Sequence, residues 1–84
     1  KKILTHLKLH EDNNFDVNYI LGVIEGIQGN SILACDLFNS ASKIRPDHAD
    51  TYYNLGLTYF KIEDYTNAEL NIKIALNFFA ELRP

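Results

Sequence analysis

The sequence predicts an all-α fold: an antiparallel helix-hairpin solenoid of two repeats with an extra N-terminal helix. Two observations support this prediction. Apolar residues recur at helical spacing along most of the 84 residues, and the sequence matches itself when it is shifted by 34 residues, from Leu21 to Leu55. Because a chain this short buries only about 60% of the surface that its unfolded form exposes, we expect a thin core.

The self-match places residues of similar size on one another. The matched residues include Tyr19 with Tyr53, Leu21-Gly22 with Leu55-Gly56, Ala34 with Ala68, Ala41 with Ala75, and Ile44 with Phe78. A glycine inside a helix costs up to ~1 kcal/mol relative to alanine, so it indicates a place where a neighbouring element comes close. We therefore expect Phe38 and Ile72 to fill the space beside these glycines.

This spacing and these residues resemble the tetratricopeptide repeat. The second copy reads Tyr52-x-x-Leu55-Gly56-x-x-Tyr59, then Ala68, Ile72 and Ala75, and the first reads Asn18-x-x-Leu21-Gly22-x-x-Glu25, then Ala34, Phe38, Ala41 and Pro46. The resemblance covers roughly residues 15–82. The first copy departs from the family pattern at Asn18 and Glu25, where aromatic residues are usual, and the second at Ala80, where proline is usual.

The N-terminal residues 1–14 form the first predicted unit. Ile3, Leu4 and Leu7 share one helical face, which predicts a short helix over 2–10. We interpret this helix either as the remnant of a preceding repeat or as a helix that folds back onto the first repeat. Since the sequence begins with Lys1 and contains no Met, we also interpret the chain as a piece of a longer or processed protein.

The remaining sequence divides into repeat 15–48 and repeat 49–84. The predicted helices are 16–28 and 31–44 in the first repeat, and 49–62 and 65–82 in the second. Gly29-Asn30 and Glu63-Asp64 separate the helices of each pair, with Asn30 or Ser31 and Asp64 as the predicted N-caps. Arg45-Pro46-Asp47 separates the repeats, and Asp47 is the predicted cap of the next helix.

The resemblance implies that the chain is a scaffold or adaptor that binds a protein or peptide partner along a concave face formed by the first helix of each repeat. The implied groove residues are Asp16, Tyr19, Val23, Ile27, Asp50, Tyr53, Leu57, Phe60 and Lys61. The two tyrosines would be anchors, and the charged residues would select the partner. Alternatively, a neighbouring repeat, the N-terminal helix or another copy covers these residues.

Some members of the family hold a C-terminal carboxylate with Lys, Asn and Arg side chains. Tyr19, Val23 and Asp50 occupy matching places here, and acidic residues would repel a carboxylate. We therefore expect an apolar partner segment with a basic residue near Asp16 or Asp50.

A second hypothesis assigns the chain to self-assembly. Phe78, Phe79 and Leu82 follow one another at the end of the last predicted helix, and no later helix in the sequence covers them. In this hypothesis they pack against a second copy and form a homo-oligomer.

The composition argues against several other classes. With a net charge of -3 and scattered basic residues, the sequence lacks the basic stripe of a nucleic-acid-binding protein. It also lacks the apolar run of ~18 residues that membrane insertion requires. We find no Gly-rich phosphate loop, paired catalytic carboxylates or Cys–His arrangement, so we expect neither enzymatic activity nor a cofactor.

The histidines and the single cysteine have simple interpretations. His6 and His10 share a helical face near Glu11 and Asp12, but two histidines rarely define a zinc site, so we interpret them as solvated. His48 in the turn between repeats is expected to face water. Cys35 is expected to be a buried, unreactive thiol, and a single thiol is compatible with a reducing compartment such as the cytoplasm.

Overall fold

The computed structural model describes residues 14–81, and all the regular structure in that range is helical. Four helices follow in order: α2 (Phe15–Ile27), α3 (Ser31–Ile44), α4 (Ala49–Lys61) and α5 (Tyr65–Glu81). The predicted all-α class is therefore confirmed, and the four predicted helices agree with the observed ones to within one residue at each end. The predicted N-terminal helix and Leu82 lie outside the described residues.

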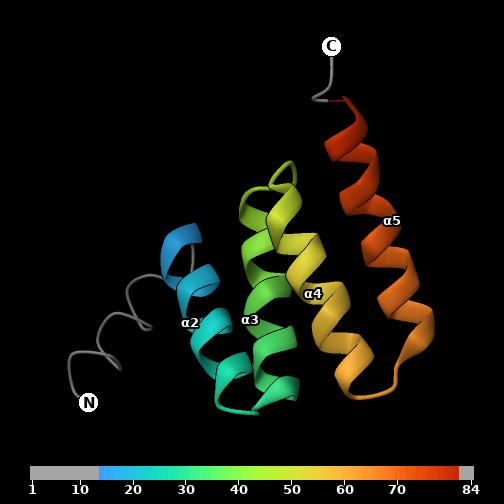
Figure 1. The fold of residues 1–84 in the computed structure, drawn as a ribbon. Coiled ribbons are helices and arrows are strands. Elements are labelled where there is room, and N and C mark those ends of the chain that lie inside the picture. The colour runs from blue at the N-terminus through green and yellow to red at the C-terminus, as the bar shows by residue number, and fades with distance from the viewer. Residues whose placement is uncertain (1–13, 82–84) are drawn as a thin grey trace.

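Each helix packs mainly against the next one in the sequence. The closest pairings are α2 with α3 and α4 with α5, while α3 and α4 join the two hairpins and α2 also touches α4. Figure 1 shows the helices standing in a row in this order.

Both hairpins contain the same close contact between their helices. A Cβ atom added at Gly22 would lie 2.8 Å from the ring of Phe38, and one added at Gly56 would lie 2.7 Å from the side chain of Ile72. These contacts confirm the expected role of Phe38 and Ile72. Glycine is needed at both places because any larger residue would overlap with the facing helix.

The two hairpin turns also match in detail. Gly29 and Glu63 are the residues of the described range with positive φ, at 90° and 65°. After each of them the chain donates a backbone hydrogen bond back into the preceding helix, from Asn30 N to Glu25 O at 2.8 Å and from Asp64 N to Tyr59 O at 3.0 Å. This is the Schellman arrangement, which satisfies carbonyl groups at a helix end.

The helix starts agree with the predicted caps in part. Asp64 Oδ1 accepts a hydrogen bond from Asn67 N at 3.3 Å, as predicted for a cap. Asn30 is the N-cap residue of α3, but its side chain makes no capping bond and instead donates to Glu25 Oε1 at 2.7 Å. The prediction for Asp47 is wrong, because the N-cap residue of α4 is His48.

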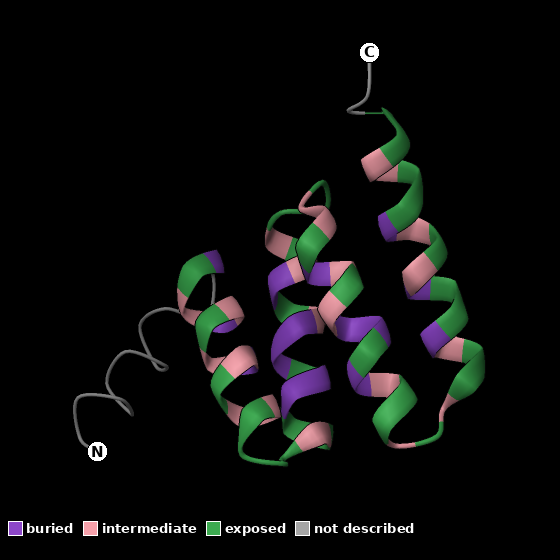
Figure 2. Ribbon diagram, in the orientation of Figure 1, coloured by how far each residue is buried: buried purple, intermediate pink, exposed green. Residues whose placement is uncertain are grey.

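The core lies where the two hairpins meet. Ala34, Cys35 and Phe38 of α3 form a buried cluster with Leu55 of α4. Figure 2 shows the buried residues gathered on the facing sides of the central helices. The burial of Cys35 agrees with the sequence prediction.

Candidate protein-interaction face

The first helices of the two hairpins, α2 and α4, are connected by a tyrosine. Asn54 Nδ2 of α4 donates a hydrogen bond to the Tyr19 hydroxyl of α2 at 2.9 Å. The Tyr19 ring stacks on Phe15 at a centroid distance of 5.6 Å and meets His48 edge-on at 5.2 Å. Four neighbouring residues of the chain therefore hold Tyr19 in place, counting its ring contact with Phe38.

The surroundings of Tyr19 also affect its ionisation. Burial and the nearby carboxylate of Asp50 raise the pKa of the Tyr19 hydroxyl, while the hydrogen bond from Asn54 opposes this rise. The phenol consequently stays neutral around pH 7, and its hydrogen bond with Asn54 is preserved.

A shallow hollow of about 140 Å³ lies between α2 and α4. Its lining brings together four of the nine predicted groove residues, Val23, Ile27, Leu57 and Lys61. Gly22 and Gly26 form part of its floor, where the absence of side chains leaves room for an occupant. The arrangement therefore offers an apolar depression with one cationic side chain at its rim.

Several apolar side chains around this hollow are open to solvent. Ile27 is 79% exposed and Phe60 is 60% exposed, and Tyr53 and Leu57 also belong to the exposed large apolar residues. Asp16, Asp50 and Lys61 are exposed as well. Adjacent exposed apolar residues with a charged rim are typical of a protein-interaction surface. We refer to the nine predicted residues as the α2/α4 face.

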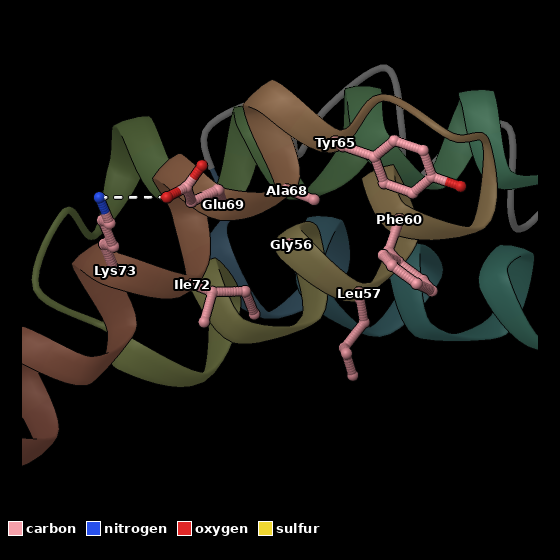
Figure 3. A pocket seen from close by; sticks show the side chains of 8 residues that line it. All are labelled: Gly56, Leu57, Phe60, Tyr65, Ala68, Glu69, Ile72 and Lys73. Atoms are coloured by element: carbon pink, nitrogen blue, oxygen red, sulfur yellow. Dashed lines mark ion pairs between the residues drawn. The ribbon is translucent and has the colours of Figure 1, made fainter.

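Phe60 lies at the boundary of a second depression, which we name the α4/α5 groove. This groove has a volume of about 400 Å³ and is lined by Gly56, Leu57, Phe60, Tyr65, Ala68, Glu69, Ile72 and Lys73. Figure 3 shows the aromatic rings of Phe60 and Tyr65 side by side at one end, and the Lys73–Glu69 ion pair, at 3.2 Å, at the other. Leu57 therefore contributes to both depressions.

Three contributors to this region did not follow from the sequence pattern. His48 was expected to face water, but it packs edge-on against Phe15 at 4.8 Å and lies 2.8 Å from Thr51 Oγ1. Asn54 and Thr58 line the hollow although only their polarity is visible in the sequence. Their positions, three and one residues from Leu57, are the signal that places them on its side of the helix.

The predicted self-association residues that the structure describes are partly covered by the chain itself. Phe78 stacks on Tyr52 with a centroid distance of 5.9 Å. Phe79 lines a small hollow with His48 and Asp50, and both phenylalanines are half-buried. Leu82 lies outside the described residues, so the geometry of the three-residue cluster stays a prediction.

The cysteine has no ready role in chemistry at this face. Burial, together with the negative charges of Asp36 and Asp64, raises the pKa of the Cys35 thiol to about 11. The thiol therefore stays protonated and weakly nucleophilic near neutral pH.

Two further searches concern residues 14–81. In that range no three His, Cys, Asp or Glu residues stand close enough to hold a metal ion, and His6 and His10 lie outside it. None of the described helices has the length and apolar character needed to cross a membrane.

Comparison of the sequence with protein-family models and with curated proteins found no match. The resemblance to the tetratricopeptide repeat therefore depends on the residues and contacts given above.

Proposed function

We propose that the chain is a tetratricopeptide-type scaffold that binds a segment of a partner protein along the α2/α4 face. The repeat assignment is supported by the matching glycine contacts and hairpin turns of the two helix pairs. The observation that carries the binding proposal is the exposed apolar group on two adjacent helices, bordering a hollow that contains Val23, Ile27 and Leu57.

The chemistry of the face defines the partner that it favours. Its floor is apolar, so a partner must offer apolar side chains to displace water from it. Asp16 and Asp50 are exposed at the end of the face where α2 and α4 begin. A basic residue of the partner near these carboxylates would fix its direction on the face.

Tyr53 is the proposed anchor, since it is exposed and makes no reported contribution to the core cluster. Tyr19 has a different role in this proposal. Because its hydroxyl and ring are already engaged within the chain, Tyr19 supports the shape of the face and offers only part of its surface to a partner.

The test is to screen helical and extended peptides that carry an apolar stripe and a basic residue at one end, with fluorescence anisotropy as the readout. For a peptide that binds, we expect Tyr53→Ala to weaken binding roughly tenfold or more, as for a typical anchor residue. The helicity and the urea midpoint should stay unchanged, because Tyr53 is outside the core cluster.

Tyr65→Ala is the matched control, since Tyr65 is another exposed tyrosine but lies on α5 outside the α2/α4 face. Replacing the basic residue of the peptide with an acidic one should also weaken binding. Equal effects of Tyr53→Ala and Tyr65→Ala, or a loss of helicity that parallels the loss of binding, would contradict the proposal.

A further inference from the structure

We infer that copies of this chain associate head to tail, with the outer side of α2 of one copy seated in the α4/α5 groove of the next. The chain itself contains an example of this contact, because α4 packs against the α2–α3 hairpin. The inference does not require that the α2/α4 face binds a partner, because it follows from the correspondence of surfaces 34 residues apart.

The α4/α5 groove corresponds to the surface that α4 covers within the chain. Gly56, Ala68 and Ile72 of the groove stand 34 residues after Gly22, Ala34 and Phe38. Ala34 and Phe38 are buried beneath Leu55 of α4, whereas the groove is open over a volume of about 400 Å³ (Figure 3). The groove therefore has the form of a surface that receives a helix with a leucine at the place of Leu55.

The helix of this chain that matches α4 under the same shift is α2, which carries Leu21 at that place. Its outer side is more apolar than that of α4. Asn54 and Thr58 of α4, which face α2, correspond to Ile20 and Ile24, and these isoleucines are 55% and 41% exposed.

The side chains that these isoleucines would meet follow from the contacts between α2 and α4. Tyr19 faces Asn54, and Val23 shares the hollow with Thr58. Shifting both contacts by 34 residues puts Ile20 opposite Tyr53, and Ile24 opposite Leu57, of the neighbouring copy. A head-to-tail contact would thus cover apolar side chains that a single chain leaves open on both helices.

The charges at the edge of the contact are complementary as well. Asn39 Nδ2 of α3 donates a hydrogen bond to the Tyr59 hydroxyl of α4 at 3.2 Å. The residues at the corresponding places are Lys73 in the groove and Glu25 on α2. A cation of one copy therefore faces a carboxylate of the next where the chain has a hydrogen bond within itself.

Glu69 occupies the place that corresponds to the buried Cys35. It already pairs with Lys73 at 3.2 Å, and both side chains are largely exposed. In the assembly Lys73 would stand between two carboxylates, so the contact is more polar than the core and should be reversible.

A contact between two different surfaces leaves one groove and one α2 helix open after each addition, so it produces open chains unless the rotation closes a ring. Light scattering over a wide concentration range should show an average mass that rises with concentration and passes that of a dimer. Charge reversal tests the orientation. We expect Lys73→Glu alone and Glu25→Lys alone to weaken association at least tenfold, because like charges then meet.

Mixing these two variants should restore association, since each reversed residue then meets an opposite charge on the other chain. Ile24→Asp should also abolish association. Ile32→Asp is its matched control, because Ile32 is a similarly exposed isoleucine (66%) that lies on α3. Circular dichroism confirms that each variant is folded before its mass is compared.

Two results would overturn the inference: a chain that stays monomeric at every concentration, or an association that Ile24→Asp leaves unchanged. The second result would point to groove-to-groove pairing or to contacts through Phe78 and Phe79. A monomer that still binds peptides through Tyr53 would overturn the self-association and leave the proposed function intact.

Discussion

At the scale of single residues, burial determines which groups keep their usual chemistry. Cys35 shares the centre of the core with Phe38 and Leu55, and its thiol has a pKa raised to about 11 from the ordinary 9.0. The folded state therefore favours the neutral thiol over the thiolate, whose charge would be poorly solvated there.

This shift predicts slow reaction of Cys35 with thiol reagents. At pH 8 a pKa of about 11 instead of 9.0 lowers the thiolate fraction roughly a hundredfold, so modification should be at least that much slower in the native chain than in urea. The stability contributed by the neutral thiol is present below pH 9 and is lost as the pH rises from about 9 to about 11.

Urea unfolding at successive pH values measures the second effect, with Cys35→Ala as the reference because it has no thiol to titrate. The wild-type midpoint should fall more steeply above pH 9 than that of Cys35→Ala. Equal modification rates in native and unfolded chains would show that the thiol is accessible and ordinary.

At the scale of helices, the hairpin contacts depend on residues that lack side chains. Gly22 faces the Phe38 ring at a distance that leaves no space for a Cβ atom, whereas a Cβ at Gly26 would lie 3.8 Å from Ala34. Both glycines belong to α2, so their different surroundings separate packing from helix propensity.

We expect Gly22→Ala to destabilise the chain by ~1–3 kcal/mol, because the buried Phe38 ring has little room to move and overpacking outweighs the propensity gain. Gly26→Ala should be neutral or stabilising by up to ~1 kcal/mol, since its Cβ has ordinary contacts. Denaturant midpoints of the two variants provide the measurement. Similar effects of both substitutions would show that the helices separate easily at Gly22.

The helices and their pairing could be predicted from the sequence because the apolar period, the glycines and the turn residues are local signals. The structure confirms the resulting helix boundaries and the glycine contacts. The role of His48 could not be predicted, because its packing against Phe15 depends on how the connection between α3 and α4 folds back over α2. The engagement of Tyr19 by Asn54 similarly depends on the tertiary arrangement of α2 and α4.

At the scale of the whole molecule, the stability is concentrated between the hairpins. The core cluster joins α3 to α4, whereas α5 packs mainly against α4 alone. Elements with fewer packed neighbours open more readily than the rest.

We therefore predict that amide protons of α3 and α4 exchange more slowly than those of the second half of α5, by roughly a factor of ten or more. Hydrogen exchange followed by mass spectrometry or NMR measures this difference, with the unfolded chain as the reference for intrinsic rates. Equal protection of α5 and the two central helices would mean that the described helices open as one unit.

The pairing of each helix with its immediate neighbour along the chain also has a consequence for folding kinetics. Only short connections need to close before α2 meets α3 or α4 meets α5, so little chain entropy is lost before the contacts form. Helical proteins with such local contacts fold in microseconds to milliseconds. Either hairpin can therefore serve as the starting point, and the contact between α3 and α4 completes the structure.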